Sequence, residues 1–377
     1  MKYFIFGAGN IGRLFYKKLP EQAKLSVCGF IDNDKSKQGE MIEGKKIMPM
    51  DEALALADNI IIAMKSRFML DAYKMVKNSG YTGRVYVMKQ ACQYSSCEEV
   101  NSLDVDDHIC AVSMDMPLLE QVETDIVAHC NLKCKHCGHR SNVLKPEFMS
   151  IESFNRDVSR LAELYAGCER FKILGGEPLL HPKVGDFVKA LRRSLPLTVI
   201  YVTTNGLLLP KIKDGVLKDM RSAGAIFEIS CYPPTQQILH DIHERCNAYG
   251  IECVVSSLIK EFYVFENREP CEDMAEAYRH CLYPKCHSMK DGYIAVCGAG
   301  IFGQRNAEMD GKPISDEEFA PNRINLYDTS LTGEKLNKLL RSPIPLCRSC
   351  GVREPKAVPW ESENPTYNCF KNKVFKI

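Results

Sequence analysis

The sequence has almost no net charge and no long hydrophobic run. Its formal net charge is +1, and no basic stripe with interleaved aromatic residues is present. This argues against nucleic acid as the main partner. No apolar stretch approaches the roughly 20 residues that a membrane-spanning helix needs. The N-terminus has one lysine and a short apolar run that enters a glycine motif directly, which favours a first strand over a signal peptide and predicts a cytoplasmic protein.

Cysteine, in contrast, is abundant. The chain has 18 cysteines in 377 residues. Without a signal peptide, this number indicates a reducing compartment and metal ligands rather than disulfides. The length allows two or three domains.

The first residues predict a nucleotide-binding turn. An apolar strand at 2–6 leads into Gly7, Gly9 and Gly12 of a G-x-G-x-x-G motif, and a helix follows. Glycines in this context allow a tight turn and close approach of a phosphate to the helix. A second strand ends at Asp32, about 20 residues past the motif, where a carboxylate can accept from ribose hydroxyls. Further strands are predicted at 58–64 and 84–88, and further helices at 51–56 and 66–79.

Residues 1–92 are therefore predicted to be a half-size Rossmann-like domain, followed by a linker at 93–120. Since only one of the two halves of a dinucleotide domain is present, a mononucleotide or nucleotide-sugar ligand is favoured. The stretch 29–34, with Gly39 and Gly44 after it, resembles the N-terminal domains of bacterial sugar acyltransferases and other surface-glycan enzymes. The alternative is a docking or dimerisation module without a ligand.

Cys130, Cys134 and Cys137 form a C-x3-C-x2-C run. Thiolates bind iron–sulfur clusters and zinc, and three of them leave one iron of a [4Fe–4S] cluster open for another ligand. Two other interpretations remain. The cysteines belong to a zinc site completed by one of the nearby histidines, or they are simply buried side chains. The histidines considered as the fourth zinc ligand are His129, His136 and His139.

Two later motifs favour the catalytic interpretation. Gly175-Gly176-Glu177-Pro178 follows an apolar run at 171–174, and a Thr-Thr-Asn-Gly motif at 203–206 follows a strand-like run at 197–202. Active sites lie at such strand ends in barrels of parallel strands. Strand-like and helix-like segments alternate through 121–275, which predicts parallel strands with helices outside.

Together these motifs resemble the radical S-adenosylmethionine (SAM) superfamily. The resemblance implies a partial (β/α)6 barrel at 121–275, a [4Fe–4S] cluster on Cys130, Cys134 and Cys137, and SAM on the open iron. Reductive cleavage of SAM would give a 5′-deoxyadenosyl radical that takes a hydrogen atom from a substrate. It would also require a flavodoxin- or ferredoxin-type electron donor. The implied SAM-binding residues are Gly176 and Glu177 at the amino group, His136 near the adenine, and Asn205 and Ser230 at strand ends.

The C-terminal residues 276–377 contain a second group of cysteines. Cys286 and Cys297 flank a predicted hairpin, and Cys347 and Cys350 form a C-x2-C pair. The pattern resembles the SPASM and twitch extensions of radical SAM enzymes, which implies one auxiliary [4Fe–4S] cluster on these four cysteines. Cys281 is an alternative to Cys286, and Cys369 is a further cysteine in this region. A structural zinc site with the same four ligands is the other interpretation.

The sequence thus predicts an α/β enzyme with a Rossmann-like domain, a partial barrel and a small cysteine-rich extension. The favoured substrate is a nucleotide-activated or glycan-linked sugar of polysaccharide biosynthesis, which would undergo dehydrogenation, epimerisation or rearrangement. A peptide-modifying enzyme is the second hypothesis, although no winged-helix peptide-recognition domain precedes the barrel. A zinc-stabilised nucleotide-binding regulator without catalysis is the third. A nicotinamide oxidoreductase is weakened by the missing second half of its domain.

Overall fold

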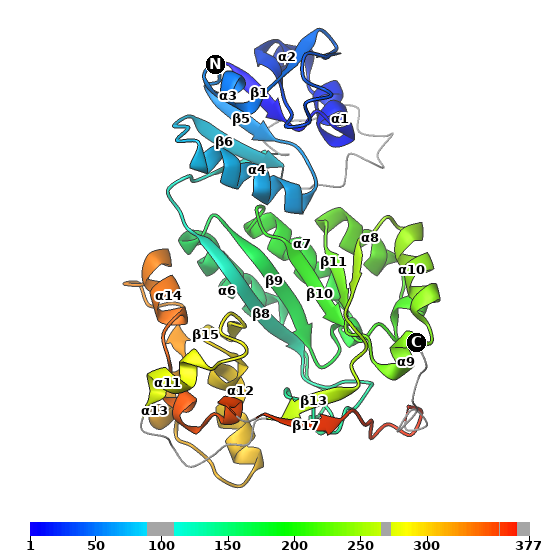
Figure 1. The fold of residues 1–377 in the computed structure, drawn as a ribbon, viewed down its shortest axis with the longest axis vertical. Helices are drawn as coiled ribbons and strands as arrows, with labels where there is room; N and C mark the ends of the chain where they lie inside the picture. Colours follow the sequence, from blue (N-terminus) through cyan, green and yellow to red (C-terminus); the bar gives the residue numbers. More distant parts are fainter. Residues whose placement is uncertain (89–108, 265–272, 354, 368–377) are drawn as a thin grey trace.

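A computed structural model describes residues 1–88, 109–264, 273–353 and 355–367. Figure 1 shows three parts: an N-terminal sheet with its helices at one end, a larger central sheet, and a C-terminal region at the opposite end. None of the helices in these described ranges is long and apolar enough to cross a membrane.

The N-terminal sheet has seven strands in the order β3-β4-β2-β1-β5-β6-β7. Strands β4, β2, β1, β5 and β6 run parallel, while β3 and β7 pair antiparallel at the two edges. The sequence predicted four of these seven strands and missed the short β3 and β4 and also β7, which lies in the stretch predicted as a linker. The strands are β1 (Tyr3–Phe6), β2 (Val27–Ile31), β3 (Met41–Ile42), β4 (Lys45–Met48), β5 (Asn59–Ile62), β6 (Arg84–Met88) and β7 (Ile109–Val112).

Part of the stretch predicted as a linker belongs to the two sheets. Strand β7 pairs with β6 and carries Cys110, and the first central strand begins at Leu118. Cys92 and Cys97 lie outside the described residues. Within the described residues, four helices flank the N-terminal sheet, and its strand β5, with three isoleucines after Asn59, is buried along its length. These helices are α1 (Asn10–Lys18), α2 (Glu21–Ser26), α3 (Met50–Leu54) and α4 (Ser66–Asn78).

The glycine motif forms a tight turn between β1 and α1. Gly7 has φ +120°, a region that disfavours side chains, and its N–H donates to the Ile31 carbonyl at 2.8 Å. A Cβ atom on Gly12 would stand 1.7 Å from the Gly7 carbonyl oxygen. Around Gly9, in contrast, a Cβ atom would meet nothing within 4 Å. Gly7 and Gly12 are therefore required by packing, whereas Gly9 borders open space.

Replacing Gly12 with alanine is expected to destabilise the N-terminal part by about 1–3 kcal/mol or more, because the added methyl group collides with backbone that cannot rotate away. Gly9→Ala is the matched control, since Gly9 has an ordinary φ of −80° and its surroundings are open. Chemical denaturation of both variants measures the difference. Equal stability of the two would contradict the packing described for the turn.

Helix α4 joins the N-terminal part to the central one. Arg67 forms an ion pair with Glu252 at 2.6 Å, and Lys74 forms one with Glu169 at 2.9 Å. The apolar core of the N-terminal part continues into Leu197, at the N-terminal side of a central strand. The two parts therefore share buried surface in addition to the chain connection.

The central sheet has the order β12-β11-β10-β9-β8-β14-β15-β16. Strands β8 to β12 are parallel, and helices alternate with them, which confirms the predicted alternation in this part of the chain. The sixth parallel neighbour is β14, which comes from the C-terminal region and pairs with β8. The strands of residues 118–264 are β8 (Leu118–Val127), β9 (Gly167–Gly175), β10 (Ile200–Thr204), β11 (Ile226–Ile229), β12 (Cys253–Val255) and β13 (Glu261–Val264).

The helices cover one face of this sheet and leave the other face open (Figure 1). Their apolar sides pack on alternate strand residues such as Val122, Phe171 and Val202 in one continuous core. This leaves the opposite set of strand residues to face outward from the core. The helices are α6 (Ile151–Leu164), η2 (Pro178–Leu180), α7 (Val184–Ser194), η3 (Leu209–Lys211), α8 (Asp214–Ala223), α9 (Pro233–Gln236) and α10 (Leu239–Ala248).

The C-terminal region contains the predicted hairpin and a returning segment. Strands β14 (Ser288–Lys290) and β15 (Tyr293–Ala295) are joined by Asp291 and Gly292, both with positive φ, as a tight hairpin turn requires. Strand β17 (Lys356–Pro359) returns to pair antiparallel with β13, near the loop that follows β8 (Figure 1). The remaining elements are α11 (Met274–Arg279), α12 (Gly298–Met309), α13 (Asp316–Phe319), η4 (Ala320–Asn322), β16 (Ile324–Asn325), α14 (Gly333–Leu340), η5 (Pro345–Ser349) and η6 (Gly351–Arg353).

Candidate active site

The C-x3-C-x2-C run lies in the loop that follows β8, at the carboxyl end of the parallel strands. The Cys130 N–H donates to the Ser141 carbonyl at 3.1 Å, and the Cys137 N–H donates to the Cys134 carbonyl at 3.3 Å. These bonds fold the loop back on itself and keep all three thiols in one compact segment. This is the end of the sheet at which the sequence predicted the site.

The thiols lie against apolar side chains. Cys134 is buried in a small cluster with Leu132 and Trp360, and Cys130 and Cys137 pack against this cluster. Burial raises the pKa of Cys130 and of Cys134 to about 12. Thiolates are therefore disfavoured here until a positive charge compensates for the lost solvation, as a bound metal does.

The donors around the thiols fit an iron–sulfur cluster. The Leu132 N–H lies 3.4 Å from the Cys130 sulfur, and the indole Nε1 of Trp360 lies 3.2 Å from the Cys134 sulfur. N–H donors of this kind stabilise cluster-ligating sulfurs. The three thiols and the N–H donors beside them are the features that match an iron–sulfur cluster. Nowhere in the described ranges are three or more His, Cys, Asp or Glu side chains already arranged to hold a metal ion.

The Gly-Gly-Glu-Pro motif joins the ends of β8 and β9. A Cβ atom on Gly176 would stand 2.1 Å from the His129 carbonyl oxygen, so only glycine allows this approach. The Gly176 N–H donates to the Val127 carbonyl at 2.8 Å, and the Glu177 N–H donates to the His129 carbonyl at 3.1 Å. The motif thus fixes the start of the cysteine loop.

The carboxylate of Glu177 is fully buried and accepts three hydrogen bonds. Thr204 Oγ1–H donates at 2.6 Å, the Asn205 N–H at 2.9 Å and the Leu179 N–H at 3.0 Å. The side chain therefore links the end of β10 to the motif. The predicted contact of Glu177 with SAM can consequently come only from its backbone, because its carboxylate points into the interior.

The stability of the chain is expected to depend on the ionisation of Glu177. Burial raises its pKa to about 7, whereas an unfolded glutamate titrates near about 4.3. Between these values the folded chain keeps a proton that the unfolded chain has lost, so this contribution to stability falls as the pH rises from about 5 to about 7. For this one titrating group, the free energy of unfolding changes by at most about 1.4 kcal/mol per pH unit. Urea denaturation of the apoprotein and of Glu177→Gln measures it; parallel pH profiles would contradict the burial effect.

Asn205 lies directly beside the cysteine loop. Its Nδ2 donates to Asn131 Oδ1 at 2.8 Å and lies 3.6 Å from the Cys130 sulfur. Of the predicted SAM-binding side chains, this one contacts a cysteine. His136 is exposed on the loop, and Ser230 is half-buried just after β11. The Ser230 N–H donates to the Thr204 carbonyl at 2.9 Å, which keeps Ser230 at the same edge of the sheet.

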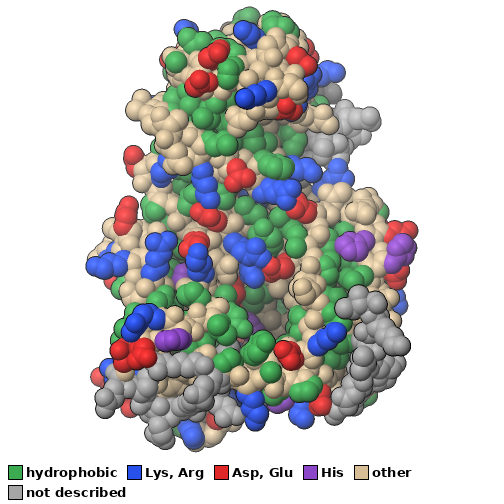
Figure 2. Space-filling view, viewed as in Figure 1, with side chains coloured by type: hydrophobic (Ala, Val, Ile, Leu, Met, Phe, Trp, Pro, Cys, Tyr) green, Lys and Arg blue, Asp and Glu red, His purple; other side chains and the backbone are tan. Residues whose placement is uncertain are grey.

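The open face of the central sheet carries charged residues that sequence reasoning missed. Glu228 on β11 accepts from Thr203 Oγ1–H at 2.7 Å, pairs with Lys172 at 3.1 Å, and also pairs with Arg170. Figure 2 shows basic and acidic side chains interspersed across this face. Polar residues alternate with apolar ones in the middle of β8 and β9, and this alternation was the signal available in the sequence. These residues are Gln121, Glu123 and Asp125 in β8, and Arg170 and Lys172 in β9.

Two acidic residues of β8 complete this polar face. Asp125 Oδ2 lies 2.8 Å from His139 Nδ1, and Asp125 raises the pKa of His139 to about 10. Glu123 accepts from Ser288 Oγ–H at 3.0 Å, and burial raises the pKa of Glu123. The face leading to the cysteine loop is thus lined by groups that bind hydroxyls and amines.

Burial and neighbouring thiols affect the pKa of several C-terminal cysteines. Burial raises the pKa of Cys297 to about 11, with further contributions from Cys281 and Cys347, and Cys281 also raises the pKa of Cys350. Gln121 Nε2 of β8 lies 3.7 Å from the Cys286 sulfur, and Cys281 also raises the pKa of Cys286. Cys286 and its alternative Cys281 therefore both stay predicted ligands. Cys369 lies outside the described residues.

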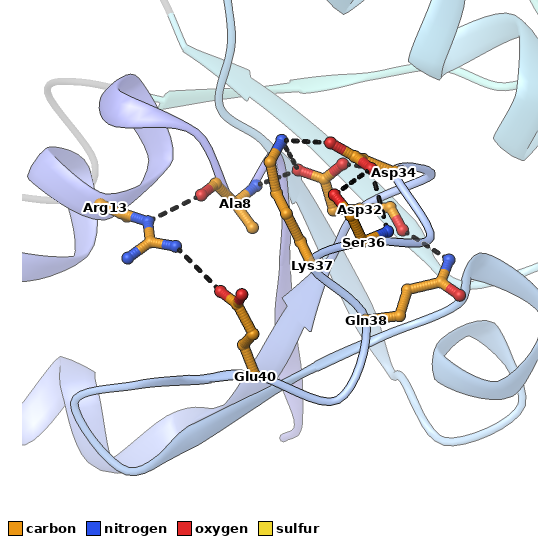
Figure 3. A network of polar contacts seen from close by, with 8 residues as sticks. All are labelled: Ala8, Arg13, Asp32, Asp34, Ser36, Lys37, Gln38 and Glu40. Carbon is orange, nitrogen blue, oxygen red and sulfur yellow. Dashed lines mark hydrogen bonds and ion pairs between the residues drawn. The ribbon is translucent and has the colours of Figure 1, made fainter.

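The predicted nucleotide site contains an internal polar network (Figure 3). Asp32 accepts from the Ala8 N–H at 3.1 Å and pairs with Lys37 at 3.4 Å. Arg13 Nε donates to the Ala8 carbonyl at 2.9 Å and pairs with Glu40 at 3.8 Å. Asp32 thus lies beside the glycine turn, as predicted, but its carboxylate accepts from the turn itself.

Two family models match parts of the chain. Residues 125–260 match the family model of the radical SAM superfamily, and residues 1–84 match a model described as C2185-like, N-terminal. The second description names no ligand, so the nucleotide site and the resemblance to sugar acyltransferases stay predictions.

Curated relatives match only part of the chain. The chain is 32% identical to a GTP 3′,8-cyclase of Geobacter sulfurreducens over 108 aligned residues. These residues cover 28% of this chain and 32% of that protein. The chain is 35% identical to molybdenum cofactor biosynthesis protein 1 of Homo sapiens over 98 aligned residues. These residues cover 25% of this chain and 14% of that protein. The chain spans less than half the length of each of these relatives.

Solved structures show a weaker likeness. BtrN in complex with AdoMet and 2-DOIA is 17% identical, with 62% of this chain and 94% of that chain covered and a TM-score of 0.36. anSMEcpe with bound AdoMet is 20% identical, with 37% and 44% covered and a TM-score of 0.31. Similarity at this level supports no inference. The match to the radical SAM superfamily model covers residues 125–260, which contain the cysteine loop, Glu177 and Asn205.

Proposed function

We propose that this chain is a radical SAM enzyme in which Cys130, Cys134 and Cys137 hold a [4Fe–4S] cluster with one open iron for SAM. The position of the three thiols carries the proposal: they share one loop at the carboxyl end of β8 and border the polar open face of the sheet. When bound, cluster and SAM together supply a 5′-deoxyadenosyl radical for hydrogen-atom abstraction.

The chain's own residues bind and orient. Gly176 and Glu177 offer backbone groups at the end of β9 for the amino group of SAM, and the buried Glu177 carboxylate fixes Asn205. Asn205 then contacts the loop at Cys130. Ser230 and His136 are assigned to the ribose or methionine part and to the adenine. Apolar side chains around Cys134 limit the access of water to this end of the sheet.

Spectroscopy of the anaerobically reconstituted chain tests this proposal. We expect iron and inorganic sulfide in equal amounts and, after reduction, an electron paramagnetic resonance (EPR) signal that changes when SAM is added, because SAM binds an iron of the cluster. Zinc without iron would instead support a non-catalytic regulator. A cluster whose signal does not respond to SAM would contradict an open iron.

We propose a hydroxyl-rich, sugar-like substrate bound on the polar face. Glu123 already accepts from the Ser288 hydroxyl, and a substrate hydroxyl can bind its carboxyl group in the same way. Glu123 lies on β8, the strand that leads to the cysteine loop. The relatives named GTP 3′,8-cyclase suggest a triphosphate instead. However, Arg170 and Lys172 are both paired with Glu228, which reduces their capacity to bind a triphosphate.

The N-terminal part is proposed to bind the nucleotide of an activated sugar at Gly7, Gly9, Gly12 and Asp32. The open space beside Gly9 supports this, because a phosphate can approach the backbone there. We expect a nucleotide-sugar to raise the melting temperature of the full chain, and Gly9→Ala to remove the rise without lowering the melting temperature of the free protein. An unchanged rise in Gly9→Ala would contradict a site at this turn.

We propose one auxiliary [4Fe–4S] cluster on Cys286, Cys297, Cys347 and Cys350, with Cys281 as the alternative to Cys286. The contribution of Cys347 to the pKa of Cys297 supports their proximity. Cys347→Ala is expected to lower the iron content from about eight to about four atoms per chain. Cys28→Ala is the control and should leave it unchanged, because Cys28 is exposed on the N-terminal part. A flavodoxin- or ferredoxin-type protein is proposed as the electron donor.

A further inference from the structure

A segment close to the C-terminus packs against the cysteine loop although more than 220 residues separate the two in sequence. Residues 360–364, here termed the brace, follow β17, and the Trp360 N–H continues the pairing with a bond to the Lys260 carbonyl at 2.9 Å. Two further backbone bonds of 2.9 Å join the brace to the loop, from the Lys135 N–H to the Glu361 carbonyl and from the Glu363 N–H to the Lys133 carbonyl.

Side chains of the brace also fix the loop. Ser362 Oγ–H donates to the Leu132 carbonyl at 2.5 Å, and Asn364 Nδ2 donates to the Asn131 carbonyl at 2.6 Å. Ser362 is buried, so its bond is protected from water. The backbone on both sides of Leu132 therefore depends on residues far away in the sequence.

Trp360 is the only tryptophan of the chain. It is buried, and its indole Nε1–H donates to the Cys134 sulfur at 3.2 Å. Its ring lies 5.9 Å from that of Tyr232 at an interplanar angle of 31°. Since an indole has one donor and no acceptor, this sulfur satisfies its whole hydrogen-bonding capacity. The brace holds the ring so that the donor points at a cysteine of the loop.

We propose that Trp360 is a positioning residue that sets the reduction potential of the cluster held by Cys134. The proposal rests on the proposed function, because it requires a [4Fe–4S] cluster on the loop. Reduction adds one electron, and much of the added charge lies on the sulfurs. An N–H donor to a ligating sulfur stabilises the reduced state more than the oxidised state. Without this donor the cluster is harder to reduce.

The single tryptophan makes a clean substitution possible. Biosynthetic replacement of tryptophan by benzothienylalanine changes only position 360, and it keeps the shape of the ring but removes the N–H. EPR-monitored redox titration of the reconstituted full chain then gives the potential. We expect the reduction potential of the cluster to be lower in the benzothienylalanine chain. At the same applied solution potential, the ratio of reduced to oxidised cluster should fall roughly tenfold, which corresponds to a shift of about 59 mV for a one-electron couple. Trp360→Phe should shift the potential in the same direction.

Phe262→Leu is the control, because Phe262 packs on the same apolar cluster but has no polar atom to bond a sulfur. Its potential should match that of the unaltered chain. Equal potentials for the unaltered and the benzothienylalanine chains, with full iron and sulfide in both, would overturn the assignment of Trp360 while leaving the proposed function intact. An unaltered chain that assembles no cluster would contradict the proposed function itself, and the assignment with it.

Discussion

Replacement of Cys134 by alanine is expected to abolish the cleavage of SAM by the reconstituted chain. Cys134 is the most buried of the three loop cysteines and lies between Leu132 and Trp360. With one thiolate missing, two protein ligands remain for a cluster that needs three, and no replacement ligand is on the loop at this position. We expect loss of the loop cluster and a fall in 5′-deoxyadenosine formation of at least about a thousandfold.

A cysteine-to-alanine substitution outside the loop shows whether the loss of activity is specific to Cys134 or follows from the loss of any thiol. Cys28 is exposed on the N-terminal part, far from the loop, so Cys28→Ala should keep both the cluster and the activity. Cys28→Ala should melt at a temperature close to that of the unaltered apoprotein, whereas Cys134→Ala should melt somewhat lower, because it leaves the buried Trp360 N–H without its acceptor. Persistent SAM cleavage by Cys134→Ala would show that the loop is not the site of the cluster.

Replacement of Glu177 by alanine is expected to lower the free energy of unfolding by about 3–5 kcal/mol. The carboxylate is the acceptor for Thr204 Oγ1–H and for the backbone N–H groups of Leu179 and Asn205, all in a buried environment. Alanine leaves these donors without a partner and without access to water. Urea denaturation of the apoprotein measures the loss.

Glu177→Gln is the matched variant, because its amide oxygen still accepts while its NH2 group meets a donor. We expect it to retain most of the stability that alanine loses. A loss below about 1 kcal/mol in Glu177→Ala would mean that the three donors find other partners, and would contradict the role of Glu177 as the link between β9 and β10.

The cysteine loop and the Gly-Gly-Glu-Pro motif were predictable because each is a local pattern at the end of an apolar strand. Their neighbours were not. The indole of Trp360 and the loop are separated by more than 220 residues, and no periodicity in the sequence links them. Only the pairing of β13 with β17 brings them together, and antiparallel pairing of such short strands leaves little trace in composition.

The polar face shows a different limit. The alternation along β8 and β9 is visible in the sequence, but the ion pairs of Glu228 require the register of three neighbouring strands. In the N-terminal part, the position of Asp32 beside the glycine turn followed from its spacing, whereas its bond to Ala8 depends on side-chain orientation. Spacing in the sequence thus predicted which motifs lie together, whereas the side-chain partners within them depend on the fold.

The most direct test of the central claim is the formation of 5′-deoxyadenosine by the full chain, reconstituted anaerobically with iron and sulfide and supplied with SAM and a strong reductant. The account predicts 5′-deoxyadenosine and methionine in equal amounts, formed by the unaltered chain and by Cys28→Ala but not by Cys134→Ala. A fully loaded chain that binds SAM but yields no 5′-deoxyadenosine under any reducing condition would contradict it.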